Sequence, residues 1–276
     1  MSILLNAETT FIVQGITGRE AVNLTRECLD YGKGAKVVGG VTPGRLGREV
    51  HGVPVFDTVA QAVEHHGSPI DGSVVTVPPA FTKDAVLEAL DNGIKLIVIV
   101  TERIPRADVA QMVERANETG ARIIVPTGAL LGLDAVRAAA EGDVASVTIE
   151  TRKPPRGLEG APYLVENGID VLGITTATLV FKGNAFDAAR GFPANVNVAA
   201  ALALAGIGPE RTMVEIWGDP GVTRNTHTIR VEAASARLTM TIENVPSEEN
   251  PRTGKITPLS ILACLRGLTS TLKVGS

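Results

Sequence analysis

A histidine and an asparagine, His227 and Asn225, are separated by one residue in the stretch RNTHTI, residues 224–229. The segment Thr226–Val231 reads as a β-strand, in which side chains two positions apart point to the same face. Histidine titrates near neutral pH, so it can take up and return a proton during a reaction. Taken without its context, a strand histidine is more often structural than catalytic. We treat His227 as the candidate acid–base group, with Asn225 orienting its imidazole or the substrate.

The remaining histidines and the cysteines predict no metal site. His51 lies in a loop, and His65 and His66 close a helical pattern, so we interpret all three as structural or solvated. Cys28 and Cys264 form no CxxC pair and no Cys/His cluster. The sequence therefore predicts neither structural zinc nor a disulfide framework, and a reducing cytoplasm is the expected compartment.

A glycine-containing turn follows the first apolar run. The segment QGITGREA, residues 14–21, has the spacing GxxGxxA and opens a helical pattern. Glycines allow the backbone to approach a pyrophosphate, and a helix N-terminus offers free N–H groups and partial positive charge. We expect Gly15, Thr17, Gly18 and Arg19 to bind a nucleotide; the alternative is a tight turn without a ligand.

The loop after the second expected strand carries a hydroxyl and a cation but no acid. An NAD-binding domain usually has Asp or Glu there, accepting hydrogen bonds from the ribose. Here Thr42 and Arg45 follow Gly39 and Gly40. A guanidinium pairs well with phosphate, so NADP is favoured over NAD as the cofactor. The 3′-phosphate of CoA would suit the same residues, and in a second alternative Arg45 and Arg48 are solvated loop charges.

These loops require a framework of alternating strands and helices. Apolar runs, each followed by an amphipathic stretch, indicate a parallel sheet covered on both faces, which is a doubly wound, Rossmann-like α/β architecture. The expected strands are Thr10–Gln14, Ala35–Gly39, Gly72–Val77, Leu96–Val100 and Arg122–Val125, and the expected helices are Arg19–Tyr31, Thr58–His65, Lys83–Asn92 and Arg106–Glu118.

After about Gly142 the pattern changes to strands in near succession. This order predicts an α+β domain with an open mixed sheet and helices on one face. An uncovered apolar sheet face is normally buried against a partner, so we expect a homodimer or homotetramer joined through these sheets. The expected strands are Ser146–Thr151, Thr212–Trp217, Thr226–Val231 and Arg237–Ile242, and the expected helices are Ala185–Ala189, Ala194–Ala205 and Ile256–Leu272.

Charge and composition exclude several classes of partner. The net charge of −4 gives no reason to expect binding to nucleic acid or to an anionic membrane. No stretch approaches the length of a membrane span. Aromatic residues are only 3% of the chain, so ring stacking is not expected to be its main means of holding ligands.

The segment from Met1 to about Pro105 resembles the CoA-binding domain of the succinyl-CoA synthetase α subunit. The resemblance is carried by QGITGRE, GGVTPGRLGREVHGVPVFDT, VPPAF and VTERIP. It implies ligand contacts at Thr17, Gly18, Arg45, Pro78, Pro79 and Thr101–Ile104. The phosphorylatable histidine loop of that family is absent from the sequence, so a synthetase is not expected.

From about Ile124 to the end, the chain resembles the L-aspartate dehydrogenases. The motifs, in the order of that family, are PTGALLGLDAV, TRKPP, LVFKGNAFDAARGFPANVNVAAALALAGIG, DPGVTRNTHTI and NVPSEENPRTGKITPLSILACLRGL. The resemblance implies that His227 is the active-site histidine and that Ala129 and Asn197 contact the nicotinamide. Lys153, Arg224 and Arg252 are the candidate clamps for a dicarboxylic amino acid or keto acid.

The two resemblances together imply a two-domain NAD(P)-dependent dehydrogenase. We expect a nucleotide-binding domain at residues 1–140, with the helix 256–272 returning to it, and a catalytic and oligomerisation domain at residues 141–255. The expected reaction interconverts aspartate with oxaloacetate and ammonia through iminosuccinate. The alternative is a CoA or acyl-CoA binding protein, or a CoA-linked oxidoreductase, which would have no need for both Asn197 and His227.

Overall fold

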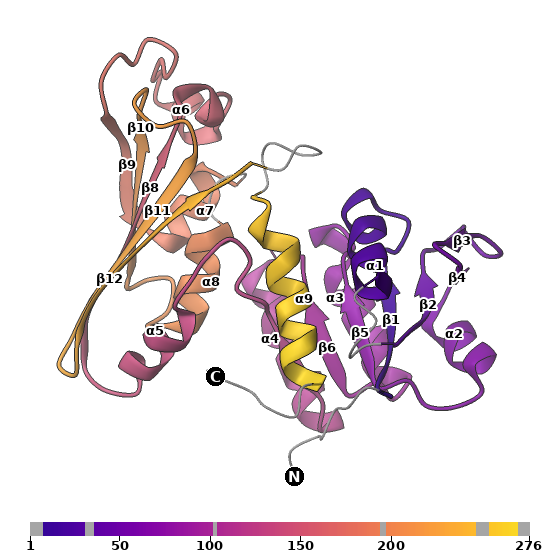
Figure 1. Cartoon of the computed structure of the whole chain (residues 1–276). Coiled ribbons are helices and arrows are strands. Elements are labelled where there is room, and N and C mark those ends of the chain that lie inside the picture. The colour runs from indigo at the N-terminus through magenta and orange to yellow at the C-terminus, as the bar shows by residue number, and fades with distance from the viewer. Residues whose placement is uncertain (1–7, 31–35, 102–103, 194–196, 247–253, 270–276) are drawn as a thin grey trace. The chain divides into compact units, whose positions relative to one another are not determined.

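The computed structural model describes residues 8–30, 36–101, 104–193, 197–246 and 254–269. The described residues divide into two compact units (Figure 1), the first formed by those from 8 to 126 and from 258 to 269 and the second by those from 127 to 257. The division falls after residue 126, earlier than the expected residue 140. The reason is that helix α5 (Leu133–Ala140) places Leu133, Val136 and Ala139 in the core of the second unit.

The first unit is built on a seven-stranded sheet in the order β3-β4-β2-β1-β5-β6-β7. All its pairings are parallel except that of β3 with β4. The direction of strand order reverses at β1, which is where doubly wound sheets bind ligands. The strands are β1 (Thr10–Gln14), β2 (Lys36–Val41), β3 (Glu49–Val50), β4 (Val53–Phe56), β5 (Gly72–Val75), β6 (Leu96–Ile99) and β7 (Arg122–Ile124).

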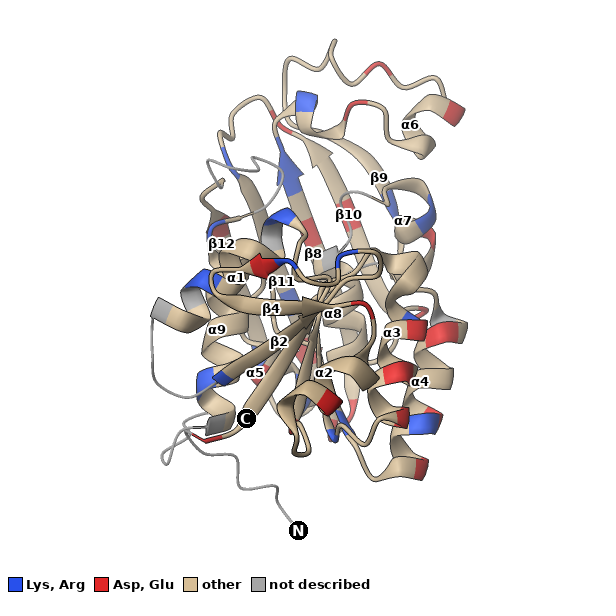
Figure 2. Ribbon diagram, turned by 90° about the vertical axis from the view of Figure 1, so that its right-hand side faces the viewer, with Lys and Arg blue, Asp and Glu red and all other residues tan. Residues whose placement is uncertain are grey.

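Helices cover both faces of this sheet because alternate strand residues are apolar on both sides. On one face, Ile12 and Ile97 pack with α2 (Val59–His66), α3 (Pro79–Asp91) and α4 (Arg106–Thr119). On the other face, Phe11 and Val13 pack with α1 (Arg19–Asp30). Strands β1, β5 and β6 carry no charged residue, whereas α3 and α4 carry many (Figure 2).

The last described helix, α9 (Ile256–Thr269), supplies the rest of the second cover. Its residues Ile261, Leu262 and Leu265 are buried in the same cluster as Phe11 and Leu24. A helix from the C-terminal part of the sequence thus completes the core of the first unit.

The second unit is built on a five-stranded sheet in the order β12-β11-β8-β10-β9. Strands β8 and β10 are parallel and the other pairs are antiparallel, so the sheet is mixed. The expected fold class, a Rossmann-like parallel sheet followed by an α+β domain with a mixed sheet, is confirmed. The strands are β8 (Val144–Lys153), β9 (Thr178–Asn184), β10 (Thr212–Gly218), β11 (Asn225–Ala233) and β12 (Arg237–Asn244).

The two faces of this sheet differ in chemistry. Val147, Ile149, Val214 and Ile229 point inward and share a core with α5 and with the short helices of the unit. These helices are η1 (Pro155–Leu158), α6 (Pro162–Glu166), α7 (Ala185–Gly191) and α8 (Asn197–Ala205).

The outward positions of this sheet carry threonines and charged residues, such as Thr148, Glu150, Arg152, Thr228 and Arg230. The expectation of an exposed apolar sheet face is therefore wrong, because the strands alternate apolar inward with polar outward.

Several described elements were not expected from the sequence: the hairpin β3–β4, the strand β9 and the helices α5, η1 and α6. Strands β3 and β4 are too short to show a period, and β9 contains two adjacent buried residues, Val180 and Phe181, in place of a strict alternation. In the described part of the chain, no helix combines the length and apolar character needed to cross a membrane.

Candidate active site

The glycine-containing turn lies between β1 and α1. Gly15 has a φ of +83°, and a side chain at this position would meet Thr76 Oγ1 at 2.8 Å. The Gly18 N–H donates to the Gly15 carbonyl at 2.9 Å, which closes the turn directly before the helix. The positive φ and the close approach to Thr76 require glycine at position 15, and the turn leads directly into the N-terminus of α1, where a pyrophosphate can bind.

The turn is tied to the loop that follows β2. Thr17 Oγ1 donates to Thr42 Oγ1 at 3.3 Å, so these two expected ligand contacts are neighbours. The Arg45 and Leu46 N–H groups both donate to Asp57 Oδ1, at 2.9 and 3.0 Å. Asp57 follows β4, and β4 pairs with β2, so the hairpin that the sequence did not reveal holds the backbone of the candidate phosphate loop.

The cationic side chains of this region face solvent. Arg19, Arg45 and Arg48 are exposed, whereas Thr42 is half-buried. Exposure leaves these arginines available to an anionic ligand.

The two other loops expected to contact the ligand, around Pro78 and around Thr101, offer few free hydrogen-bond donors. Pro78 precedes α3 and Pro79 is its first residue, and proline has no N–H to donate. Thr101 Oγ1 donates to the Val77 carbonyl at 2.6 Å, so its proton already holds the loop before α3. Ile104 packs against the core of the first unit, and residues 102–103 lie outside the described residues.

In the second unit, the inward face of the sheet changes from apolar to polar toward one end. Along β8, Val147 and Ile149 are followed by Thr151 and Lys153. Antiparallel β11 lies beside it and places His227 opposite Thr151. The alternation of the strands therefore brings a hydroxyl, an ammonium and an imidazole to one end of the buried face.

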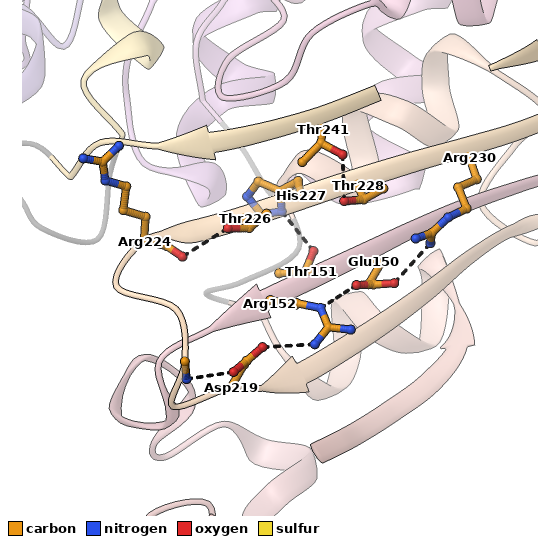
Figure 3. A network of polar contacts seen from close by, with 11 residues as sticks. Glu150, Thr151, Arg152, Asp219, Arg224, Thr226, His227, Thr228, Arg230 and Thr241 are labelled. Atoms are coloured by element: carbon orange, nitrogen blue, oxygen red, sulfur yellow. Dashed lines mark hydrogen bonds and ion pairs between the residues drawn. The ribbon is translucent and has the colours of Figure 1, made fainter. Parts of the chain in front are cut away.

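His227 is 4% exposed and its Nδ1 lies 3.0 Å from Thr151 Oγ1 (Figure 3). Burial, together with the nearby charge of Lys153, lowers the pKa of His227 to about 3. The imidazole is therefore neutral at physiological pH. Because Thr151 engages Nδ1, Nε2 is the nitrogen left to face another group.

Lys153, the last residue of β8, is 7% exposed. Burial lowers the pKa of Lys153 from 10.5 to about 8, because a buried ammonium has lost much of its hydration. The inward positions of the described strands β8, β10, β11 and β12 include no Asp or Glu. This end of the sheet is therefore a buried environment suited to a negatively charged ligand.

Two asparagines border the same end. Asn225 opens β11 and is paired with Asn244, the last residue of β12. Asn225 and His227 lie on one face, as the spacing predicts. Asn244 is 5% exposed and its Nδ2 donates to the Ala129 carbonyl at 3.3 Å. The backbone oxygen of Ala129, an expected cofactor contact, thus has a partner within the protein.

Three further residues, Arg224, Asn197 and Arg252, were expected at this site. Arg224 is exposed and its side chain lies apart from the His227–Thr151 pair (Figure 3). Asn197 is the first residue of α8, but its side chain is outside the described part of the structure, as is Arg252.

A network of ion pairs covers the outward face behind this site (Figure 3). Glu150 accepts hydrogen bonds from Arg152 at 2.6 Å and from Arg230 at 3.1 Å, and Arg152 also pairs with Asp219 at 3.0 Å. Burial acts to raise the pKa of Glu150, but the two arginines hold it below its usual value. The Arg152 guanidinium also lies 4.6 Å from the centre of the Trp217 ring.

Three residues of these sites were not singled out from the sequence: Thr151, Asn244 and Asp57. Thr151 stands inside the quoted motif TRKPP, two residues before Lys153. Asn244 opens the quoted motif NVPSEENPRTGK, at the end of a strand. Strand pairing alone brings them to His227 and Asn225. Asp57 stands inside the quoted motif GGVTPGRLGREVHGVPVFDT, but its contact with the loop after β2 depends on the hairpin β3–β4, which was not predicted.

Comparison with known families assigns both halves of the chain. Residues 134–268 match the family described as aspartate dehydrogenase, C-terminal. Residues 6–103 match the CoA binding domain.

Individual relatives cover most of the chain. An L-aspartate dehydrogenase of Bordetella bronchiseptica is 46% identical over 87% of this chain and 86% of its own. One of Bradyrhizobium diazoefficiens is 49% identical over 78% of this chain and 75% of its own. Among solved structures, the aspartate dehydrogenase of Thermotoga maritima has a TM-score of 0.70 at 25% identity, covering 97% of this chain and 99% of its own.

Proposed function

The chain belongs to the L-aspartate dehydrogenase family, and we propose that it oxidises L-aspartate with water and NAD(P)+ to oxaloacetate, ammonium and NAD(P)H. The net reaction also releases one proton, and the reverse reaction is the reductive amination of oxaloacetate. The proposed substrate is thus a dicarboxylic amino acid or keto acid.

The observation that carries the choice of substrate is that Lys153 and His227 are both buried at one end of the second sheet, close enough for the charge of Lys153 to lower the pKa of His227. Burial lowers the pKa of Lys153 to about 8. A carboxylate of the substrate bound beside Lys153 would oppose this effect and favour the charged form of Lys153. Exposed Arg224 is a second candidate for carboxylate binding, and we keep Arg252 as a third.

His227 is proposed as the proton carrier. Its imidazole is neutral near pH 7 and so has a lone pair for a proton, but a pKa of about 3 makes proton uptake unfavourable in the unliganded protein. Proton transfer therefore requires that an anionic substrate bound beside Lys153 raise the pKa of His227. Deamination requires that a water molecule lose a proton as it attacks the imine carbon, and that the departing amine gain one. We assign both transfers to Nε2, since Thr151 engages Nδ1 at 3.0 Å and holds the ring in place. Asn225, on the same face, is assigned to orient the substrate.

The first unit is proposed to bind the dinucleotide. The turn at Gly15 leads directly into the N-terminus of α1, where a pyrophosphate can bind, with Gly18, Thr17 and Arg19 around the start of the helix. When bound, NAD(P)+ accepts the hydride from the substrate Cα. We retain Pro78, Pro79 and Thr101 as contacts of this ligand. Ala129 and Asn197 are retained as contacts of its nicotinamide.

We favour NADP over NAD as the dinucleotide. Arg45 is exposed on a loop whose backbone Asp57 holds, and Thr42 stands three residues before it. An arginine pairs with a 2′-phosphate through charge-assisted hydrogen bonds. The match of residues 6–103 to the CoA binding domain keeps CoA as the alternative ligand of the same loop.

We also propose a homodimer or homotetramer joined through the second sheet, now for a different reason. The outward face carries an ion-pair network of Glu150, Arg152, Asp219 and Arg230. A partner subunit seated on this face would exclude water from the network.

The proposal is tested by measuring NAD(P)H formation from L-aspartate, with L-glutamate and L-alanine as controls. We expect activity with aspartate and a loss of about a hundredfold or more in kcat for His227→Ala, in line with general acid–base contributions. The cofactor should still bind that variant in a thermal-shift titration. Wild-type protein that binds NAD(P) but does not oxidise aspartate would contradict the proposed substrate, and unchanged kcat in His227→Ala would remove His227 from the reaction.

A further inference from the structure

Asn244 has a buried acceptor that the protein does not use. The residue is 5% exposed, and its Nδ2 donates to the Ala129 carbonyl at 3.3 Å. Its Oδ1 is buried and has no hydrogen-bond partner among the described residues. Buried side-chain oxygens are nearly always hydrogen-bonded in folded proteins, so an exception requires an explanation such as a bound ligand.

The orientation of this amide follows from its neighbour. Turning the side chain over would bring Oδ1 against the Ala129 carbonyl oxygen, where two acceptors would repel each other. Nδ2 therefore faces Ala129, and Oδ1 is the atom that remains to accept a hydrogen bond.

Strand pairing places Asn244 beside the proposed catalytic residues. It is directly opposite Asn225, while His227 is directly opposite Ile242. His227 and Asn244 are thus diagonal neighbours on one face, which separates their positions by roughly 7–8 Å in an antiparallel pair. At this separation, the side chains of Asn244 and His227 can contact the same ligand.

Residue 254 determines how much room exists next to Oδ1. A Cβ built on Gly254 would lie 3.0 Å from Asn244 Oδ1, closer than ordinary contact. Pro246 and Gly254 form a β-bridge, so Gly254 is held in this position. Because the residue is glycine, only backbone atoms, and no side chain, cover Oδ1 on this side.

Building on the proposed function, we propose that Asn244 Oδ1 accepts a hydrogen bond from an N–H donor of a bound ligand. The two possible sources of that donor are the ammonium group of the amino-acid substrate and the carboxamide of the dinucleotide. An ammonium needs acceptors, and the inward positions of the described strands β8, β10, β11 and β12 provide no carboxylate. Asn244 thereby also links the ligand to the Ala129 segment through its Nδ2.

Two variants test this role by different routes. Asn244→Leu removes both polar atoms at nearly constant shape. Gly254→Ala keeps both polar atoms of Asn244 but puts a methyl group 3.0 Å from Oδ1 and 3.3 Å from Cβ and Cγ, so the side chain must shift slightly. Thr241→Val is the matched control, because Thr241 is on the same strand, faces outward and loses one hydrogen bond, to Thr228 at 3.1 Å. Thermal unfolding of each variant reports whether it is folded.

The measurements separate the two donors. If Oδ1 binds the ammonium, KM for L-aspartate rises about tenfold to a hundredfold in both variants, as expected for a hydrogen bond to a charged group. The inhibition constant of succinate, which lacks the amino group, stays within twofold. If Oδ1 binds the carboxamide, calorimetry with NAD(P) alone shows weaker binding, by about threefold to tenfold.

Three results would overturn the inference: constants within twofold of wild type in both variants, equal weakening of aspartate and succinate, or an effect in Asn244→Leu that Gly254→Ala does not share. The last would mean that Asn244 acts only through Ala129. A wild-type protein inactive with aspartate would contradict the proposed function, whereas the calorimetric comparison with NAD(P) would still decide the role of Asn244.

Discussion

Replacing Lys153 by methionine should make the protein more stable and less active. Lys153 is 7% exposed at the end of β8, among inward-facing side chains. Methionine has a similar length and no charge, so it can occupy the same space without the cost of burying an ammonium. The same change removes the proposed counter-charge for a substrate carboxylate.

The size of the stability gain follows from the pKa of Lys153, which burial lowers from 10.5 to about 8. Between pH 8 and 10.5 the unfolded chain holds this proton while the folded chain does not, so wild-type stability rises with pH across that window. Below pH 8 the full penalty applies, and a shift of about 2.5 units corresponds to about 3 kcal/mol. Lys153→Met should therefore be about 3 kcal/mol more stable at pH 7 and less than about 1 kcal/mol more stable at pH 10.

The assay is denaturant unfolding of both proteins at pH 7 and pH 10, followed by KM for aspartate at pH 7. Loss of a charge-assisted contact predicts a KM increase of about tenfold or more. Because the charge of Lys153 contributes to the low pKa of His227, the imidazole of the variant should also titrate at higher pH, as measured by NMR. Equal stabilities at pH 7 with equal slopes up to pH 10 would refute the reasoning, since the ammonium would then carry no burial cost.

Two further predictions concern the cofactor and the assembly. Wild-type protein should bind NADP more tightly than NAD by about tenfold to a hundredfold, and Arg45→Ala should remove most of that preference. Equal affinities of the wild-type protein for the two dinucleotides, or a higher affinity for NAD, would contradict the NADP assignment. Binding of CoA with no binding of either dinucleotide would contradict the proposed dehydrogenase function. Light scattering at micromolar concentration should show a dimer or tetramer of the wild-type protein. Arg152→Glu breaks the ion pairs with Glu150 and Asp219 and should shift the protein toward the monomer. A monomeric wild-type protein would contradict the proposed oligomer.

The sequence alone determined the fold class and the main strands. Apolar runs such as LIVI at residues 96–99 are buried on both faces, and a series of such runs, each followed by an amphipathic stretch, is typical of a parallel sheet covered by helices. The alternation around His227 likewise determined that Asn225 and His227 share one face, because this depends only on the strand period of two. The order of motifs identified the family that the comparisons show.

Tertiary structure decided which distant residues meet. Thr151 lies 76 positions before His227 and Asn244 lies 115 positions after Ala129; a local pattern holds no information on which strands pair or in what register. It also decided the charge of the site. Lysine and histidine have ordinary pKa values of 10.5 and 6.5, and burial at one end of the sheet lowers the pKa of Lys153 to about 8 and that of His227 to about 3. Desolvation depends on all the groups packed around a side chain and not on its neighbours in the chain, so the sequence alone could not predict these shifts.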